Sequence, residues 1–155
     1  MIKLHRRKPD SFAYWETWED KGEHSIHWGE VGDRGQSETI RDSFFRSAAK
    51  AIASRVAGKR QEGFEEIEEL HPLIIEYAVD GMGSSADLDQ RHRLESRLNE
   101  TLGWTGLGHC DGGSMGRGTM EVCCLIVDFD LAKKVVAADL AGTEFAHFTR
   151  IYEEE

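Results

Sequence analysis

One stretch of the sequence combines an aromatic side chain, a tight turn and a cation. Trp28 is followed by glycines at positions 29, 32 and 35, and glycine adopts the positive φ values of tight turns without a steric cost. The alternating residues 24–28 and 36–40 predict the two strands of a hairpin around this turn. An indole beside such a turn can stack on a base or a sugar, although most tryptophans in small sheets pack in the core.

Further cations lie on the segment that follows the hairpin. Apolar side chains recur there every four positions, at Phe44, Ala48, Ile52 and Val56. This spacing predicts an amphipathic helix over residues 44–60, with Asp42 or Ser43 as its N-cap. The candidate nucleic-acid-binding residues are therefore Trp28 for stacking, together with Arg34, Gln36, Arg46, Lys50, Lys59 and Arg60. A solvated helix face explains the helical cations at least as well.

The segment Trp28-Gly29-Glu30-Val31-Gly32-Asp33-Arg34-Gly35-Gln36 resembles the signature of the WGR domain, which is named for a Trp-Gly-Arg tripeptide. The resemblance covers about residues 1–68. Residues 12–15 are similar to the family's aromatic first strand, residues 44–60 to its helix, and Gly63-Phe64 to its closing Gly-aromatic pair. WGR domains occur in many bacterial proteins and in DNA-dependent poly(ADP-ribose) polymerases, where they contact DNA ends and relay their presence to the catalytic domain. Here Glu30 replaces the signature arginine and reverses its charge.

The second half of the sequence has the element order strand, helix, strand, strand, helix, strand. We expect strands at 73–79, 104–110, 119–128 and 145–152, with helices at 86–102 and after Asp128 or Asp130. This order is typical of the ferredoxin-like βαββαβ fold. The expected class is therefore α+β, with a domain boundary in the acidic connector. Residues 1–70 would form a small antiparallel sheet with one helix, and residues 71–155 a four-stranded antiparallel sheet with two helices on one face.

A glycine-rich segment, residues 111–118, is expected to be the loop between two strands of the second half. Its backbone N–H groups can cradle phosphate, which makes Asp111, Gly112, Gly113 and Arg117 candidates for a functional loop. A phosphate loop, however, normally opens a helix and carries a lysine. A bulged hairpin is therefore the favoured interpretation of this segment.

No combination of residues in the sequence predicts catalysis, a cofactor or a metal. His109 and Cys110 are neighbours, and neighbouring residues of a strand point to opposite faces of the sheet. His24 and His27 are three positions apart on a strand and therefore also point to opposite faces, and we expect both at the surface. The sequence has no CxxC pair and no second histidine at a spacing that suits zinc.

The charge of the chain is unevenly distributed. Of the net charge of -10, residues 1–70 contribute -2 and residues 71–155 contribute -8. Phosphate neutralisation drives nucleic-acid binding, so the second half is an unsuitable surface for it. Three cysteines, two of them adjacent, make a poor disulfide framework. No apolar run approaches the roughly 20 residues that span a bilayer. We therefore expect a cytoplasmic protein without a membrane partner.

These observations favour a non-enzymatic adaptor with two domains. The first would recognise nucleic acid, either DNA ends or single strands, and the acidic second domain would bind a protein partner or form a homodimer. The alternative is a purely protein-binding regulator, such as an antitoxin, an immunity protein or an inhibitor, whose acidic face masks a basic surface of its target. An enzyme that binds a nucleotide through residues 111–118 is the least favoured reading.

Overall fold

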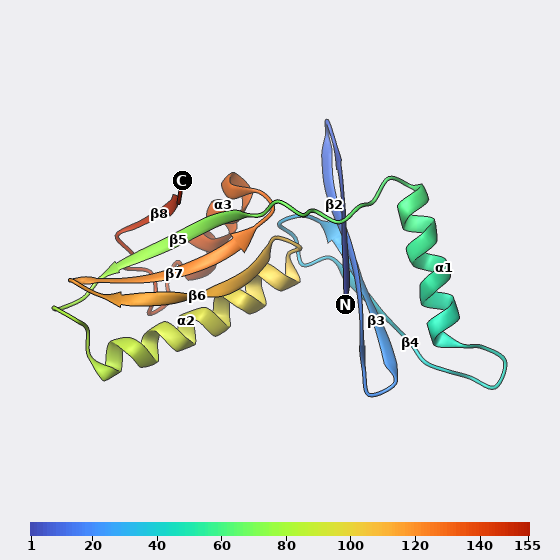
Figure 1. The fold of residues 1–155 in the computed structure, drawn as a ribbon, viewed down its shortest axis with the longest axis horizontal. Coiled ribbons are helices and arrows are strands. Elements are labelled where there is room, and N and C mark those ends of the chain that lie inside the picture. The colour runs from blue at the N-terminus through green and yellow to red at the C-terminus, as the bar shows by residue number, and fades with distance from the viewer. The chain divides into compact units, whose positions relative to one another are not determined.

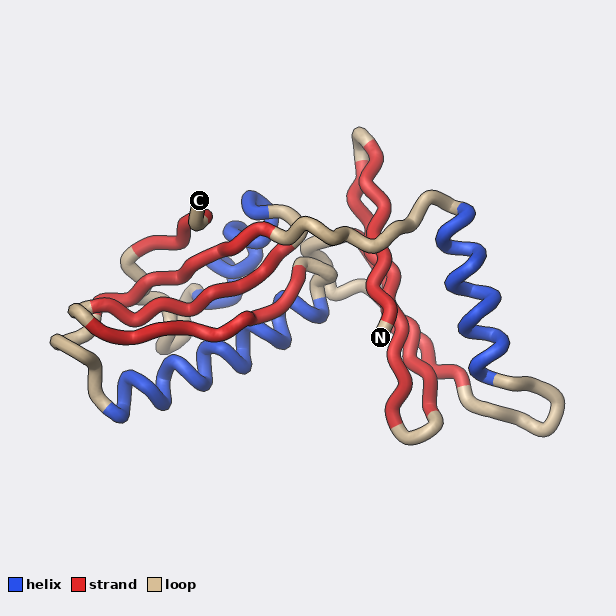
Figure 2. Tube along the Cα trace, in the orientation of Figure 1, coloured by secondary structure: helices blue, strands red, loops and turns tan.

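Eight strands in two antiparallel sheets and three helices make up the chain, which a computed structural model describes over residues 1–155 (Figure 1). These elements confirm the α+β class expected from the sequence. The chain divides into two compact units, Met1–Glu68 and Glu69–Glu155. Figure 2 shows that each unit contains one sheet and its own helical segments. None of the three helices combines the length and the apolar character that crossing a bilayer requires.

The first unit is a meander of four strands with one helix. Its strands are β1 (Ile2–Lys8), β2 (Ser11–Asp20), β3 (Glu23–Glu30) and β4 (Gln36–Ile40), hydrogen-bonded in that order. The helix α1 (Ala48–Gln61) packs on one face of the sheet through Ala48 and Ile52. The sheet contributes Leu4, Trp15, Ile26 and Ile40 to the same core. The strand β1 was not expected, because its sequence is dominated by basic residues.

The helix α1 begins later than its apolar spacing suggests. Ser47 is its N-cap and accepts a hydrogen bond from the N–H of Lys50 at 3.3 Å. The carboxylate of Asp42 accepts one from the N–H of Ala48 at 2.8 Å. Two N–H groups of the first helical turn are therefore satisfied by side chains that precede Ala48. The predicted start at Phe44 is wrong, because with these caps the helix begins directly after Ser47.

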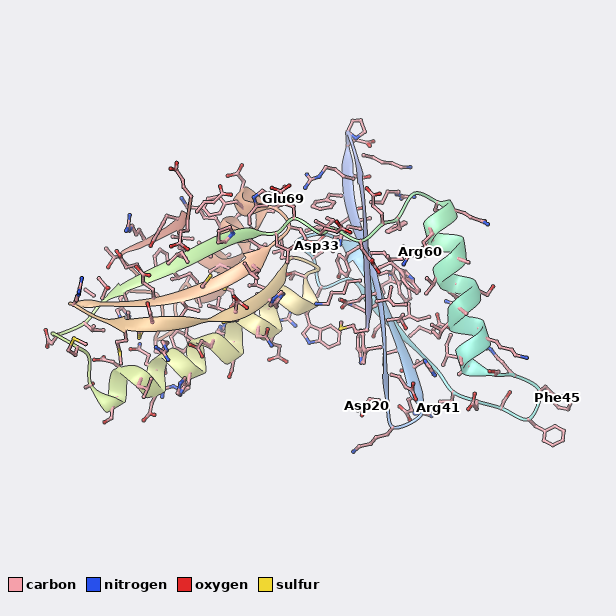
Figure 3. The ribbon with its side chains drawn as sticks, in the orientation of Figure 1. Asp20, Asp33, Arg41, Phe45, Arg60 and Glu69 are labelled. Carbon is pink, nitrogen blue, oxygen red and sulfur yellow. The ribbon has the colours of Figure 1, made fainter.

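The residues between the two caps form a turn instead of a helix. Ser43 and Arg46 exchange two backbone hydrogen bonds of 2.9 and 3.2 Å. Phe44 and Phe45, at the tip of this turn, are each 95 % exposed. Figure 3 shows Phe45 pointing away from the unit at the end of the loop. The prediction that Phe44 belongs to the apolar stripe of the helix is therefore also wrong.

The second unit has the element order predicted for residues 71–155. It consists of β5 (His71–Ala78), α2 (Ser85–Trp104), β6 (Gly108–Gly116), β7 (Thr119–Ile126), α3 (Phe129–Leu140) and β8 (Arg150–Glu153). The strand order in the sheet is β6-β7-β5-β8. The helix α2 packs against β6 and β7, and α3 packs against β5 and α2. Ser84 and Asp128 are the N-caps of the two helices, and Asp128 is one of the two positions expected from the sequence.

The glycine-rich segment differs from its prediction, because most of it belongs to a strand. Residues 111–116 lie in β6, where residues 112–116 pair with β7, and only Arg117 and Gly118 form the turn. The register shifts between Cys110 and Gly112, which is a β-bulge. The prediction of a bulged hairpin is thus confirmed, whereas the prediction that residues 111–118 are a loop between two strands is wrong. At Gly113 an added Cβ would collide with the carbonyl oxygen of Glu121 on β7 and lie 3.1 Å from side-chain atoms of Arg91 and Glu95 on α2, so this glycine allows both elements to approach closely.

Candidate ligand pocket of the first unit

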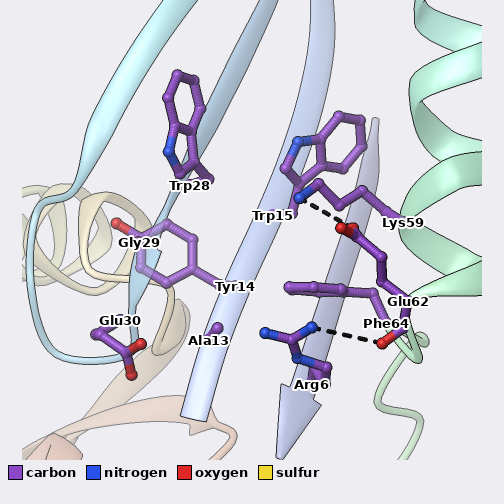
Figure 4. Close-up of a pocket in the computed structure, with 10 residues that line it drawn as sticks. All are labelled: Arg6, Ala13, Tyr14, Trp15, Trp28, Gly29, Glu30, Lys59, Glu62 and Phe64. Atoms are coloured by element: carbon purple, nitrogen blue, oxygen red, sulfur yellow. Dashed lines mark hydrogen bonds and ion pairs between the residues drawn. The ribbon is translucent and has the colours of Figure 1, made fainter. Parts of the chain in front are cut away.

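A pocket of about 300 Å³ opens on the face of the first sheet that α1 covers. Register places Trp28 opposite Trp15, and Trp15 opposite Leu4, so their side chains share this face. The C-terminal end of α1 and the residues after it close the other side. Figure 4 shows the lining residues, which are Arg6, Ala13, Tyr14, Trp15, Trp28, Gly29, Glu30, Lys59, Glu62 and Phe64.

The end of α1 places Phe64 in this pocket. Gly63 has a φ of 94°, and its N–H bonds to the carbonyl of Arg60, while the N–H of Phe64 bonds to the carbonyl of Lys59. This pair of bonds is a Schellman motif, for which glycine is the favoured residue. Glu65 then exchanges two backbone hydrogen bonds with His5 of β1, at 2.8 and 2.9 Å. The chain is thereby fixed against the sheet with the ring of Phe64 facing inward.

Two cations lie on the ring of Phe64. The guanidinium carbon of Arg6 is 4.6 Å from the ring centroid and the ammonium of Lys59 is 5.2 Å from it, both within the range of a cation–π contact. Arg6 and Lys59 come from segments more than fifty residues apart, so the fold alone brings them together. The pocket therefore has an aromatic wall and a rim that includes two cations.

Two carboxylates also line the pocket. The carboxylate of Glu62 forms an ion pair with the ammonium of Lys59 at 3.1 Å, and the backbone carbonyl oxygen of Glu62 accepts a hydrogen bond from Arg6 at 3.5 Å (Figure 4). Glu30 instead accepts a hydrogen bond from the backbone N–H of Phe12 at 3.3 Å. Glu62 is thus the internal partner of both cations, whereas Glu30 joins the end of β3 to β2.

Residues 31–35 fold tightly against the opposite face of the sheet. An added Cβ on Gly35 would collide with the carbonyl of Trp28, and one on Gly29 would lie 2.8 Å from the Cα of Gly35. Gly35 also has a φ of 65°. Two glycines of the motif are therefore needed because two backbone segments touch here, and this contact fixes the backbone that carries Trp28.

A network of three buried polar side chains, those of Tyr14, Glu16 and His27, holds the turn at residues 31–35 in place. His27, which is 1 % exposed, places its Nδ1 at 2.8 Å from Glu16 and its Nε2 against the carbonyl oxygen of Arg34. The hydroxyl of Tyr14 donates to the carbonyl of Asp33 at 2.7 Å and lies 3.2 Å from His27 Nε2. Burial and the nearby charges of Glu16 and Asp33 raise the pKa of Tyr14, so its hydroxyl remains a donor.

This network defines where the proton of His27 lies. A carbonyl oxygen can only accept, so Nε2 carries a proton and donates it to Arg34. The Nδ1 of His27 lies 2.8 Å from Oε1 of Glu16, so this carboxylate is its partner inside the unit. The expectation that His27 is a surface histidine is wrong, because the register of β2 and β3 places Glu16 beside it.

The predicted site residues do not form a single cluster. Only Trp28 and Lys59 line the pocket. Gln36 pairs with Trp28 across β3 and β4 but is exposed outside the pocket, and the exposed Arg34 is held in the turn through its carbonyl. Arg46 precedes α1 and Lys50 lies in its first turn, whereas Lys59 and Arg60 lie in its last. Arg60 is exposed near that end in Figure 3 and pairs with Glu66 at 3.3 Å.

The candidate residues of the second unit are also separated. Asp111 is the extra residue of the bulge, Gly112 follows it with a φ of 119°, and Arg117 lies in the turn at the other end of β6. This segment leads into β7 and not into a helix, so it lacks the strand–loop–helix order of a phosphate loop.

Three contributors to the pocket, Arg6, Trp15 and Phe64, were not among the predicted site residues. The signals for two of them were present, because the resemblance to WGR domains includes Trp15 in residues 12–15 and Phe64 in the Gly63-Phe64 pair. Comparisons of the chain with models of protein families, with curated proteins and with solved structures found no match.

Proposed function

We propose that this protein is a non-enzymatic adaptor whose first unit is a WGR-like module that recognises nucleic acid. The observation that carries the proposal is the position of Trp28, which is half-buried at the wall of a pocket whose rim holds Arg6 and Lys59. Stacking on an aromatic ring and neutralisation of phosphate are the two main contributions to binding of unpaired nucleotides. Both are available within this one pocket.

The size and shape of the pocket restrict the ligand. Its volume of about 300 Å³ is at the small end of the range for ligand pockets, which runs from roughly 300 to 1,000 Å³. Bases inside a duplex are covered on both faces by their neighbours, so an indole can stack only on a terminal or an unpaired nucleotide. The proposed ligand is therefore a DNA end or a single strand.

The carboxylates of the pocket set the conditions under which phosphate binds. Glu62 neutralises Lys59 in the free protein, so a phosphate would take the place of Glu62 as the partner of this ammonium. Glu30 lies beside Trp28 and repels an anion, whereas its hydrogen bond to Phe12 keeps it in place. We therefore expect weak binding that depends strongly on salt.

The second unit is proposed to be a ferredoxin-like module that binds a protein partner. Its strand order, β6-β7-β5-β8, with the element order strand-helix-strand-strand-helix-strand, supports this assignment. Its arginines are largely engaged in internal ion pairs, which are Arg91–Glu95, Arg93–Glu144, Arg97–Asp139 and Arg150–Glu76. The unpaired charges are therefore mostly carboxylates, which suit a basic protein surface.

A purely protein-binding regulator is the second candidate, and the tip of the 43–46 turn favours it. Phe44 and Phe45 contact each other edge to face, with ring centroids 5.0 Å apart, and neither ring packs on the core. Adjacent exposed aromatic side chains are typical anchors of protein interfaces. Under this alternative, replacing both with serine would weaken capture of a protein partner, whereas the nucleic-acid proposal expects the same change to leave DNA binding unaltered.

The two candidates are separated by a competition experiment. A labelled single strand is bound to the protein, and linear duplex or closed circular duplex of the same sequence is added at equal nucleotide concentration. The proposal expects the single strand and the linear duplex to bind, and the closed circle to compete poorly. Equal competition by both duplexes, or no binding at low salt, would contradict the proposed ligand.

A further inference from the structure

The three cysteines are unequal in position. Cys110 of β6 and Cys124 of β7 are direct partners in the antiparallel register, immediately before the bulge. The side chain of Cys123 lies on the opposite face of β7 from that of Cys124, and Cys123 pairs with Gly112. Directly opposed residues of antiparallel strands have Cα atoms about 4.5 to 5.5 Å apart. A disulfide spans Cα separations of about 4.4 to 6.8 Å, so the backbone already has the spacing of a cross-strand disulfide.

The two opposed thiols differ in their environments. Cys110 is half-buried, and its Sγ lies 3.6 Å from the carbonyl oxygen of Cys123. A hydrogen bond with Cys124 lowers the pKa of Cys110 to about 7, although burial and the charges of Glu95 and Asp111 oppose this. Cys124 is fully buried, and the same hydrogen bond together with burial raises its pKa. The pair therefore consists of a half-buried thiol that ionises more readily than usual and a fully buried thiol that ionises less readily.

The surrounding groups keep Cys110 in place. Its backbone N–H donates to the Oδ1 of Asn99 on α2 at 3.2 Å. The charged groups nearest to it are Glu95 of α2, which pairs with Arg91, and Asp111 of the bulge. On β7, the charge of Glu121 raises the pKa of Cys123. A thiolate is the reactive form of cysteine, and access together with a neighbouring thiol is what distinguishes a redox-active cysteine from a structural one.

We propose that Cys110 and Cys124 form a reversible dithiol–disulfide pair that is oxidised by a hydroperoxide. The Cys110 thiolate attacks the terminal peroxide oxygen, the O–O bond breaks, and the leaving alkoxide takes a proton to become an alcohol. Cys110 is then a sulfenic acid. The sulfur of Cys124 attacks the sulfur of Cys110, its thiol proton and the sulfenic hydroxyl leave as water, and the S–S bond forms. Two thiols lose two electrons, and one peroxide gains them.

This inference does not depend on the proposed function of the first unit. The disulfide would join β6 to β7 beside the bulge without moving Cys124 to the surface. A bond that closes the hairpin restricts the unfolded chain, so the oxidised protein should unfold at a higher temperature. A thiol reductant should return the unfolding midpoint to its original value.

The test is oxidation of the full-length protein with one equivalent of hydrogen peroxide, followed by intact-mass measurement and peptide mapping. The wild type should lose the mass of two hydrogen atoms and yield a peptide pair linked through Cys110 and Cys124. Cys124→Ala and Cys124→Ser should instead stop at a sulfenic acid that dimedone traps on Cys110. Cys123→Ser is the matched control and should behave as the wild type.

Other outcomes would overturn the proposal. A disulfide that involves Cys123, a bond between two protein molecules, or direct conversion of wild-type Cys110 to the sulfinic acid would each show that Cys124 does not resolve the oxidised thiol. Failure of the wild type to react at all would show that Cys110 is not accessible to a hydroperoxide. Because the wild type and Cys123→Ser decide these points, the proposal does not depend on the folding of a Cys124 variant.

Discussion

Trp15 and Trp28 are direct partners across β2 and β3, yet only one of the two indoles remains accessible. Trp15 is 3 % exposed and belongs to the core beneath α1, whereas Trp28 is half-buried and packs at the edge of that core. Both line the pocket. Trp15 therefore serves the stability of the first unit, and Trp28 is the aromatic face that a ligand can reach.

Lys59→Met should weaken DNA binding and reduce its dependence on salt. The methionine retains an unbranched apolar stem beside Phe64 but lacks the ammonium that lies 5.2 Å from the ring centroid. Loss of one phosphate contact lowers the slope of log K against log salt by about 0.7 to 0.9. Lys134→Met, on an exposed position of α3, is the control and should leave the slope unchanged. An unchanged slope for Lys59→Met would exclude this residue from the phosphate contacts.

Glu30→Gln should strengthen DNA binding. The amide oxygen of glutamine can still accept the hydrogen bond from Phe12, but the negative charge beside Trp28 is removed. A unit charge about 4 Å from another in water contributes roughly 1 kcal/mol, so affinity at low salt should rise about fivefold. The gain should shrink as salt is added. Glu23→Gln removes the same charge at the other end of the hairpin, and an equal gain there would mean that only net charge matters.

Glu16→Ala should strongly destabilise the first unit. It leaves His27 buried without its carboxylate partner, and leaving a buried polar group without its hydrogen-bond partner costs about 1 to 3 kcal/mol. Glu23→Ala breaks the exposed pair with Arg41, whose atoms are 2.7 Å apart, and should cost less than about 1 kcal/mol. The free energy of unfolding in urea measures both. Equal costs for the two variants would contradict a structural role of the Glu16–His27 pair.

Gly35→Ala should disturb the turn more than Gly22→Ala. Both glycines have positive φ, 65° and 82°, so both variants carry a backbone cost of about 1 to 2 kcal/mol. At Gly35 the new methyl group also collides with the carbonyl of Trp28 and approaches the Tyr14 hydroxyl, whereas at Gly22 no atom lies within 4 Å. Thermal unfolding of the two variants gives the comparison. Similar midpoints would mean that the turn relaxes to accept a side chain.

Local patterns predicted the elements that local interactions form. The hairpin around Gly32 and Gly35 follows from alternation and glycine, and the caps of α2 and α3 follow from Ser84 and Asp128. The start of α1 was missed because two polar caps, at Asp42 and Ser47, prevail over an apolar period of four. The sequence alone does not show which of two overlapping signals is the stronger.

The pocket itself was only partly predictable. Trp28 and Lys59 were candidates by residue type, but Arg6 and Phe64 join them only because β1 adds to the edge of β2 and the Schellman turn directs Phe64 inward. The burial of His27 likewise depends on the register that places it opposite Glu16. Such contacts depend on long-range pairing, which no local pattern encodes.

The central claim is that Trp28 stacks on an unpaired or terminal nucleotide, and fluorescence anisotropy of a labelled single strand and a blunt duplex tests it most directly. Stacking of a base on an aromatic ring contributes about 1 to 3 kcal/mol. We therefore predict that Trp28→Leu lowers the affinity by about tenfold or more, that Trp28→Phe retains most of it, and that all three proteins lose binding as salt rises. If the leucine variant unfolds at the same temperature as the phenylalanine variant and binds DNA equally well, the pocket is not the nucleic-acid site.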